Sequence, residues 1–295
     1  MPEIHIHFTL FSAFYSPLIM TMAGGFLEKN GLSYQWSVAN GLNAAVPAVR
    51  DGKVHVTQST PTQGFSSLQT GEVDEVVHFG LINQHDGFFI TGREADDQFQ
   101  WGKLEDQEVV VFKSGQPNIM FQYACHKAGI DYSKIKTVFP GNAEAIDDAF
   151  RSGQGLYVQQ QGPFPQQLET DGVGHVVARA GDVIGPCAFS SLAARRDWLA
   201  SDDAKRFTQA YLQAIEFLNT ESADKVSALL QSWFQDTDLA ALTACIASYQ
   251  DLGSWNHDMV ITDDLWDVMV DAFMLTGDLD KHYPKDTVCT EPPGI

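Results

Sequence analysis

Glu-Lys-Asn-Gly-Leu at residues 28–32 begins the stretch that decides the fold, because a similar stretch, His-Lys-Ala-Gly-Ile, recurs at residues 126–130. Both copies predict a helix that ends at a glycine, then a strand, a loop with Gly and Asn, a second helix, another glycine and a further strand. The predicted strands are 34–38 and 54–56 in the first copy and 136–139 and 156–158 in the second. Glycine just past a helix end supplies the left-handed C-cap, and alternating helices and strands imply parallel sheets. The repeat therefore predicts two similar α/β lobes, although unrelated βαβ units can resemble each other by chance.

The character of the sequence changes after residue 185. Residues 188–194 predict one more short strand, and residues 201–277 predict helices. Apolar residues recur there at helical spacing, as at Phe207, Tyr211, Ile215 and Leu218. A mainly helical C-terminal third cannot form its own sheet, so we expect it to pack on the first lobe. The expected division is residues 1–90 with 188–295 in lobe 1 and residues 91–187 in lobe 2, with hinge crossings near 88–100 and 180–190.

Composition excludes several classes of protein. The 295 residues are 44% hydrophobic and 11% aromatic, which suffices for a large core and excludes a disordered chain. The 18 Lys and Arg stand against 38 Asp and Glu, a formal charge of -20 that argues against nucleic acid as a partner. No window approaches about 18 uninterrupted apolar residues, so no membrane insertion is expected. An anionic small molecule is still compatible with this charge, because backbone N–H groups can set the local potential in a cleft.

The N-terminus, the cysteines and the histidines bear on compartment and cofactors. Residues 1–10 alternate polar and apolar side chains and lack a basic segment, so they predict a strand and no secretory signal. We therefore expect a cytoplasmic protein from the sequence as written, and a periplasmic one if an export signal has been removed. The 4 cysteines form no CxxC pair and the 9 histidines show no HExxH spacing, so we expect no metal and no cofactor.

Five short segments follow one another in a particular order. They are Ala-Gly-Gly-Phe-Leu-Glu-Lys-Asn-Gly-Leu at 23–32, Arg-Asp-Gly-Lys-Val-His-Val at 50–56, Ser-Thr-Pro at 59–61, Ile-Asn-Gln-His-Asp-Gly-Phe-Phe-Ile at 82–90 and Phe-Gln-Trp-Gly-Lys-Leu at 99–104. This order resembles that of the type II periplasmic-binding-protein fold, over a span from residue 4 to about residue 220. The resemblance implies an α/β fold of two lobes, each a mainly parallel sheet flanked by helices, with a ligand cleft between lobes that close about a hinge.

The most similar branch contains nitrate, sulfonate, taurine and thiamine-precursor binding proteins together with the fungal thiamine-pyrimidine synthase. It implies a solute-binding protein of the ABC-transporter type that closes on a small polar ligand. That ligand is heteroaromatic or anionic, such as a thiamine-precursor pyrimidine or a sulfonate. The implied partners are this small molecule and, if the protein is exported, an ABC permease. The resemblance is compatible with a monomer or a dimer.

Two enzymes that this chain resembles carry chemistry that the sequence lacks. The substrate histidine of the pyrimidine synthase would fall near Thr62 and Gln63, where no histidine stands. Its cysteine-rich, iron-binding run would fall on residues 186–190, which keep one cysteine. The catalytic cysteine of the related aryl-sulfinate desulfinase would fall in residues 12–16, which contain none. Neither reaction is expected here.

A cytosolic enzyme on the same scaffold is the alternative function. It would carry out thiamine-precursor-related or other lyase or hydrolase chemistry with His85 and Asp86, or with Cys187. A reactive thiolate needs a neighbouring histidine or cation, and Cys187 has neither beside it in the sequence. A buried thiol near the hinge is the alternative for Cys187, and it is the one that we favour.

Candidate ligand-binding residues stand where predicted strands give way to helices, because ligands of open parallel sheets bind outside the C-terminal strand ends. In the first junction, Ser12, Phe14 and Tyr15 offer rings and hydroxyl groups to a ligand, or they seal the helix against the sheet. In the second, Ser59 and Thr60 offer hydroxyl and N–H groups to an anion, or they only cap the helix.

Gln84 and His85 belong to the most polar run beside the predicted first crossing. They could bind a polar ligand or act with Asp86 as acid and base. Alternatively, the run forms a hinge turn in which Asp86 satisfies backbone groups, and we favour that structural role for Asp86.

The second copy supplies the remaining candidates. Gln116 and Asn142 lie in its two strand-to-helix junctions. Three glutamines at 159–161 end its last strand, and because a buried glutamine without partners is unfavourable, these side chains must meet water, backbone or ligand. We expect one of them to reach the ligand. Among them we select Gln159 and Gln160 as candidates, while the strand register that decides between the three stays open.

Overall fold

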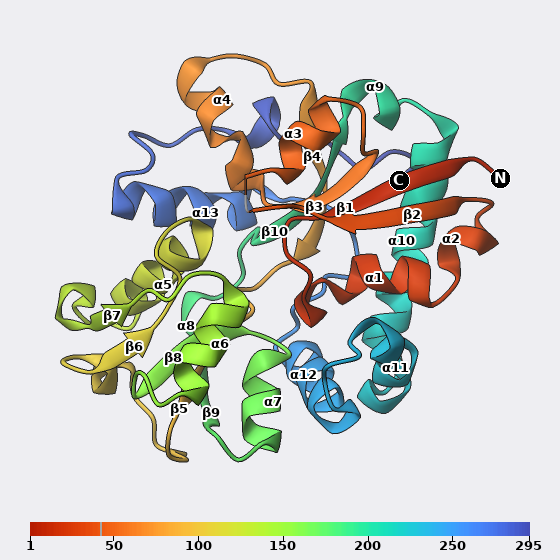
Figure 1. Ribbon diagram of the computed structural model, residues 1–295. Coiled ribbons are helices and arrows are strands. Elements are labelled where there is room, and N and C mark those ends of the chain that lie inside the picture. Colours follow the sequence, from red (N-terminus) through yellow and green to blue (C-terminus); the bar gives the residue numbers. More distant parts are fainter. Residues whose placement is uncertain (42) are drawn as a thin grey trace.

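The computed structural model describes residues 1–41 and 43–295 and contains two five-stranded sheets flanked by helices (Figure 1). The first sheet, in the order β2-β1-β3-β10-β4, consists of β1 (Glu3–Phe8), β2 (Ser33–Val38), β3 (Val56–Ser59), β4 (Val76–Asn83) and β10 (Ser190–Arg195). The second, in the order β7-β6-β8-β5-β9, consists of β5 (Phe88–Gly92), β6 (Glu108–Val110), β7 (Lys136–Val138), β8 (Tyr157–Gln161) and β9 (His175–Arg179). The predicted two-lobed α/β architecture is confirmed.

Both sheets are mainly parallel, as predicted, and each contains one reversed strand. In the first sheet, β2 and β3 run parallel to β1, whereas β10 runs antiparallel to β3 and β4. In the second, β7 and β8 run parallel to β6, whereas β5 runs antiparallel to β8 and β9. The reversed strands β5 and β10 are those that the chain enters directly after it crosses from one sheet to the other.

Helices cover both faces of the first sheet. Figure 1 shows α3 (Ala45–Arg50) on one side and α1 (Ser16–Ala23), α2 (Phe26–Lys29) and α10 (Asp202–Thr220) on the other. The other α-helices are α4 (Phe65–Thr70), α5 (Gln116–Lys127), α6 (Ala143–Arg151), α7 (Phe164–Thr170), α8 (Ala180–Ile184), α9 (Arg196–Leu199), α11 (Ala223–Leu230), α12 (Leu239–Asp251) and α13 (Asp263–Thr276). Short 3-10 helices are η1 (Ala13–Tyr15), η2 (Pro61–Gly64), η3 (Trp101–Leu104), η4 (Tyr132–Lys134), η5 (Gln231–Trp233) and η6 (Lys285–Thr287). None of the described helices is both long and apolar enough to cross a membrane.

Two short segments connect the lobes and lie side by side. Residues 84–87 lead from β4 to β5, so the first crossing precedes the predicted range 88–100, and β5 already belongs to the second sheet. Residues 185–189 lead back to β10. The N–H of Cys187 donates to the carbonyl of Gln84 at 2.8 Å, and the N–H of Phe189 donates to the carbonyl of Asn83 at 3.1 Å. These bonds join the two crossings into one hinge element.

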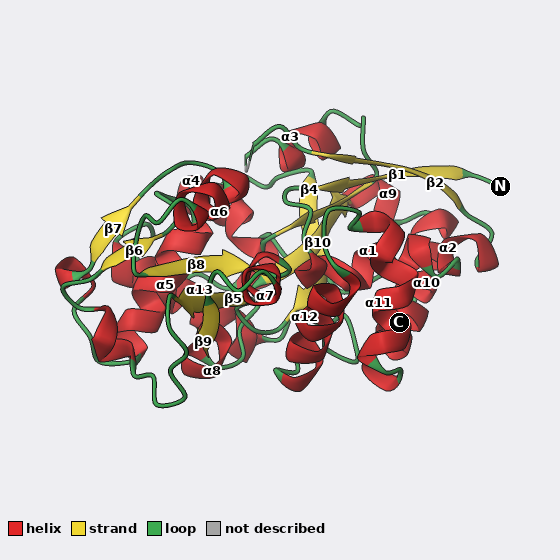
Figure 2. Ribbon diagram, turned by 60° about the horizontal axis from the view of Figure 1, so that its bottom comes forward, coloured by secondary structure: helices red, strands yellow, loops and turns green. Residues whose placement is uncertain are grey.

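The C-terminal helices contact both lobes, whereas the sequence predicted packing on the first lobe alone. Helix α10 packs on α1 and α2, as expected, but α12 packs on α7 and α13 packs on α5 (Figures 1 and 2). Apolar positions on these helices, such as Cys245, Tyr249 and Phe273, are buried. Helical spacing identifies an apolar face but leaves open which lobe covers it, and this is why the sequence missed the bridging role.

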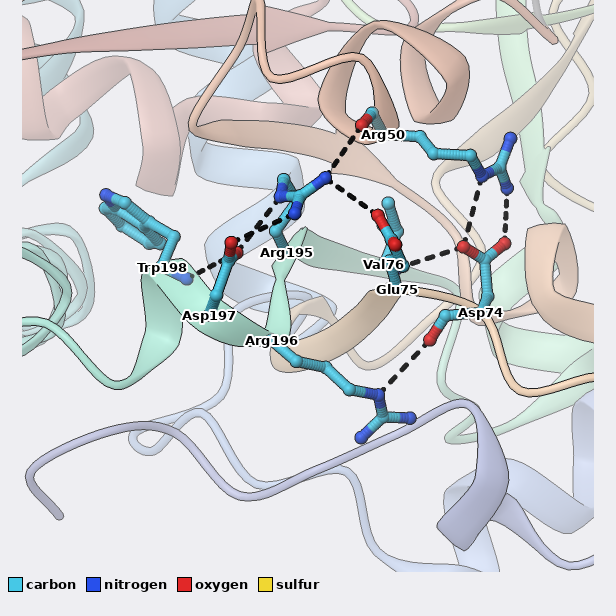
Figure 3. Close-up of polar contacts among 8 residues, drawn as sticks. All are labelled: Arg50, Asp74, Glu75, Val76, Arg195, Arg196, Asp197 and Trp198. Atoms are coloured by element: carbon cyan, nitrogen blue, oxygen red, sulfur yellow. Dashed lines mark hydrogen bonds and ion pairs between the residues drawn. The ribbon is translucent and has the colours of Figure 1, made fainter.

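An ion-pair network fixes the C-terminal end of the inserted strand β10 (Figure 3). Arg195 donates to Glu75 at 2.8 Å and to the carbonyl of Arg50 at 3.0 Å, while the guanidinium of Arg50 pairs with Asp74. Arg196 donates to the carbonyl of Asp74 at 3.2 Å. Exposed pairs of this kind contribute about 1 kcal/mol or less each. Their main effect here is to hold the loop before β4 against the end of β10.

We expect the hinge to tolerate no side chain at Gly87. A Cβ atom there would come within 2.3 Å of the Phe14 ring, which is itself buried. Gly87→Ala should therefore lower the free energy of unfolding by about 1–3 kcal/mol, the usual effect of overpacking a core. Urea unfolding measures this, with Gly102→Ala as the control, because nothing lies within 4 Å of a Cβ atom at Gly102. Equal stability of both variants would contradict the close packing.

Candidate functional site

Two adjoining cavities lie between the sheets and take their walls from both lobes. We call the smaller one, with a volume of about 160 Å³, the inner cavity, and the larger one, with about 640 Å³, the outer cavity. They share Thr9, Leu10, Phe88, Ser114 and Gln161 as lining residues. Thr9 and Leu10 follow β1 of the first sheet, whereas Ser114 precedes α5 and Gln161 ends β8 of the second lobe. The two cavities therefore form one cleft at the C-terminal strand ends, where open parallel sheets bind ligands.

The inner cavity combines apolar walls with hydrogen-bonding side chains. Phe88 and Phe189 are buried and contribute ring surface. The buried hydroxyl of Tyr15 accepts a hydrogen bond from Nε2 of Gln161 at 3.4 Å, and burial raises the pKa of this phenol. Gln63 reaches the cavity from the second junction. This mixture of flat apolar surface and a few polar groups is typical of small-molecule sites.

The outer cavity opens beside a cluster of stacked aromatic rings. Phe11 lines this cavity, and its ring centre lies 5.1 Å from that of Trp36 and 5.2 Å from that of Phe234. On the opposite wall, Lys113 and Glu144 are both exposed. The outer cavity thus carries charged groups.

Gln116 joins the two lobes across the inner cavity. Its Oε1 accepts hydrogen bonds from the hydroxyls of Thr60 and Thr62, the second at 2.9 Å. Its Nε2 donates to the carbonyl of Phe189 at 2.7 Å. Gln116 begins α5 in the second lobe, whereas Thr60 caps η2 in the first. All three hydrogen bonds of the Gln116 side chain therefore connect the second lobe to the first lobe or to the return crossing.

A second set of hydrogen bonds connects the lobes at the other end of the cleft. Ser12 donates from Oγ to the carbonyl of Gly162 at 2.7 Å. The N–H of Gly162 donates to the hydroxyl of Tyr249 at 2.8 Å, and this hydroxyl donates to the carbonyl of Gly87 at 3.0 Å. Tyr249 lies on α12, so the C-terminal helices take part in this contact. The structure is that of a closed cleft.

Six of the eleven sequence candidates line the cleft. Tyr15, Thr60 and Gln116 line the inner cavity, and Ser12, Asn142 and Gln160 line the outer one. Asn142 is also the N-cap of α6, where its Oδ1 accepts from the N–H of Ala145 at 3.1 Å. Gln160 is buried, and its Oε1 has no hydrogen-bond partner among the described residues.

The structure does not bring the other five candidates to the described cavity walls. Phe14 is fully buried and packs on Tyr15, Phe189 and Tyr249. Ser59 and Gln159 are also buried, and neither lines either of the two cavities. The amide of Gln84 and the ring of His85 both donate to the carbonyl of Gly253, at 2.9 and 3.2 Å, so they hold the crossing against the loop after α12.

The groups of the enzyme alternative are poorly placed for catalysis. Asp86 is completely buried and accepts from the N–H of Phe88 at 2.7 Å, the turn role that the sequence favoured. Burial raises the pKa of this carboxyl to about 7. Cys187 is also buried, and burial raises the pKa of its thiol far above the ordinary value. A thiol whose pKa is raised is a poor nucleophile at neutral pH.

Sequence reasoning missed several lining residues that stand close to its candidates. Gln63 follows Thr60 within the same junction, and Ser114 precedes Gln116 by two residues. Gln161, which lines both cavities, is the third of the three glutamines. The signal was therefore present in the segments, and the strand register decided which side chain reaches the cleft.

Comparisons with known proteins agree with this architecture. A sequence profile described as the NMT1-like family matches residues 9–231. YtlA of Bacillus subtilis (strain 168), inferred to be a binding protein, is 28% identical over 278 residues, which are 92% of this chain and 83% of YtlA.

Solved structures share the fold. The alkanesulfonate-binding protein SsuA from Xanthomonas axonopodis pv. citri, bound to MOPS, superposes with a TM-score of 0.75 at 14% identity and covers 99% of both chains. The periplasmic nitrate-binding protein NrtA from Synechocystis PCC 6803 superposes with a TM-score of 0.71 at 14% identity, over 98% of this chain and 86% of NrtA. At these identities the likeness establishes the two-lobed fold and leaves the ligand open.

Proposed function

Because the chain belongs to the NMT1-like family, we propose that it is a solute-binding protein of the ABC-transporter type that holds one small polar molecule between its lobes. The observation that carries this proposal is the cleft, which both lobes line and close through Gln116 and Ser12. Groups that contact a ligand from both sides favour closure by their differential affinity for the closed state.

An ABC permease is the proposed macromolecular partner, and the outer side of the cytoplasmic membrane is the proposed place of action. NrtA is described as periplasmic, which supports the place of action, and a structural neighbour from Staphylococcus aureus is described as the ligand-binding component of an ABC-type import system, which supports the permease. Because ligand contacts to both lobes stabilise the closed state, a receptor that binds both lobes at once can distinguish the liganded protein from the open one. The buried Asp86 and Cys187 support binding over catalysis.

Native mass spectrometry with pools of pyrimidines, sulfonates, amino acids, carboxylates and nitrate tests the proposal. We expect one adduct of unchanged mass after long incubation, and the same compound should raise the melting temperature. A ligand at about 100 times its Kd stabilises the folded state by about 2.7 kcal/mol. Conversion of the compound to a new mass would make the protein an enzyme, and failure of every pool to bind would overturn the proposal.

Filling the inner cavity should abolish this response. Ser114 is small and exposed and lines both cavities, so a tryptophan there can enter the cleft without disturbing the core. We expect Ser114→Trp to weaken binding at least about a hundredfold, since the indole takes the space of the ligand. Ser66→Trp, on the exposed face of α4, is the matched control and should bind like the unmodified protein. An unchanged affinity in Ser114→Trp would place the ligand elsewhere.

A further inference from the structure

Strand β2 forms an outer edge of the first sheet and pairs on one side only, with β1. The N–H of Ser33 donates to the carbonyl of Pro2 at 2.9 Å, and the N–H of Ala39 donates to the carbonyl of Phe8 at 2.8 Å. In a parallel pair every second residue of a strand bonds to its neighbour, so the odd-numbered residues of β2 bond to β1. The backbone N–H and carbonyl groups of the even-numbered residues therefore point away from the sheet, and no other described segment bonds to them.

The other outer edges of the two sheets are protected. Beyond β4, the N–H of His78 donates to the carbonyl of Val288 at 2.8 Å, and the N–H of Thr290 donates to the carbonyl of His78 at 2.9 Å, so the C-terminal segment covers that edge. Strand β7 is only 3 residues long and begins with the exposed Lys136. Strand β9 pairs with β5 in an irregular register and ends at Arg179. Short length, charge and bulges are devices by which proteins prevent pairing between sheet edges.

Strand β2 lacks these devices. Its 6 residues, Ser-Tyr-Gln-Trp-Ser-Val, include neither a charged side chain nor a proline, and its register with β1 is regular. Trp36 is 43% exposed and Val38 is 46% exposed. A long, uncharged edge strand with exposed apolar side chains is a surface on which another strand can pair.

The charge distribution favours a second copy of this chain as the partner. Residues 31–49 contain no charged side chain, whereas the whole chain has a formal charge of -20. Two molecules of this charge repel each other except where both present uncharged surface. A basic partner would be attracted to the acidic surface instead, so the uncharged edge suits a partner of the same charge.

The sequence of β2 also fits pairing with itself. In an antiparallel pair about a two-fold axis at Trp36, this residue lies opposite Trp36 of the second copy, and Tyr34 lies opposite Val38. The even-numbered residues, whose backbone groups are free, then exchange hydrogen bonds. Glu3, which accepts from Nε2 of Gln35 at 2.7 Å, and the same residue of the second copy lie toward opposite ends of the paired strands. This orientation therefore keeps like charges apart.

We infer that two copies of this chain associate through β2, antiparallel and about a two-fold axis at Trp36, so that their first sheets become one continuous sheet. The backbone hydrogen bonds and the burial of Trp36 and Val38 stabilise the dimer. Because Val38 also lines the outer cavity, the interface adjoins the cleft. The inference goes beyond the proposed function and does not depend on the identity of the ligand.

Sedimentation velocity of the full chain without ligand tests the association. We expect a dimer that forms with a Kd between about 1 and about 100 µM, the range of a small interface. Val38→Lys should raise this Kd at least about tenfold, because a lysine on the edge opposes pairing. Val73→Lys, at a position that is 71% exposed in the loop before β4, is the matched control and should dimerise like the unmodified protein. A monomer at every concentration, or an equal Kd in Val38→Lys, would overturn the inference.

Cross-linking tests the antiparallel geometry. In the inferred dimer the two copies of position 35 lie on one face of the joined sheet, about 8 Å apart. A short bismaleimide should therefore convert Gln35→Cys to a covalent dimer, and adding Val38→Lys should suppress this product. The 4 native cysteines are all buried, and Gln98→Cys, at an exposed position of the second lobe, is the control. No covalent dimer in Gln35→Cys, or an equal amount in Gln98→Cys, would contradict pairing through β2.

Discussion

Replacing Asp86 with asparagine is expected to stabilise the protein at pH 8 by up to about 4 kcal/mol and to leave its stability at pH 4 nearly unchanged. The carboxyl is completely buried, its Oδ2 has no partner among the described residues, and burial raises its pKa to about 7. A carboxyl whose pKa is higher in the folded than in the unfolded state favours folding while it is protonated. That contribution is lost as pH rises from about 4 to about 7.

Urea unfolding at several pH values measures the effect as the difference between the variant and the unmodified protein. Burial lowers the pKa of His78 to about 4, so the contribution of this histidine to the free energy of unfolding is lost as pH falls from about 6.5 to about 4. This pH dependence is opposite to that of Asp86. Both proteins contain His78, and its contribution cancels in the difference. Asp97→Asn, at an exposed position of the second lobe, is the control. Parallel stability curves for Asp86→Asn and the unmodified protein would contradict the buried, unpartnered state of Asp86.

Removing the Gln116 side chain is expected to open the unliganded protein. Gln116→Ala deletes the acceptor of Thr60 and Thr62 and the donor to Phe189, so the closed state loses its contacts on one side of the cleft. At about 1 kcal/mol for each hydrogen bond, the equilibrium should move toward the open state by about tenfold to a hundredfold. The apparent affinity for ligand should fall by a similar factor, because fewer molecules are in the binding-competent state.

Small-angle X-ray scattering of the unliganded protein measures this opening as a larger radius of gyration. The control is Gln122→Ala on the same helix, since the amide of Gln122 donates to Asn118 within α5, at 2.8 Å, and reaches no residue of the first lobe. Saturating ligand should return Gln116→Ala to the compact form. Scattering curves for Gln116→Ala and the unmodified protein that superpose without ligand would show that other contacts hold the cleft closed.

The repeat at 28–32 and 126–130 predicted the two α/β lobes because glycine stops and alternating periodicity are local signals. The first crossing lies at residues 84–87, directly before the predicted range of 88–100, because the polar turn at Asp86 carries the chain between the sheets and the apolar segment Phe88-Phe89-Ile90 already forms β5. The bridging by α12 and α13 could not be predicted, because an apolar helix face fits either lobe.

The candidate site was predictable by segment and much less so by residue. Every junction that the sequence singled out contributes to the cleft, yet Gln161 lines both cavities while Gln159 is buried below them. Neighbouring residues of a strand point to opposite faces, so a change of one position in register exchanges a lining residue for a core residue. His85 shows why some candidates could not be judged from the sequence at all. Its ring forms a hydrogen bond with Gly253, which lies 168 residues away in the chain.

The interior position of β10 in the first sheet, between β3 and β4, sets the order in which the chain can fold as it leaves the ribosome. β3 and β4 are not neighbours, and the space between them stays open until residues 190–195 have been synthesised. The second sheet, by contrast, uses only residues 88–179 and is complete before then. During translation the second lobe can therefore form first, while the unpaired edges of β3 and β4 await their last strand and are exposed to chaperones.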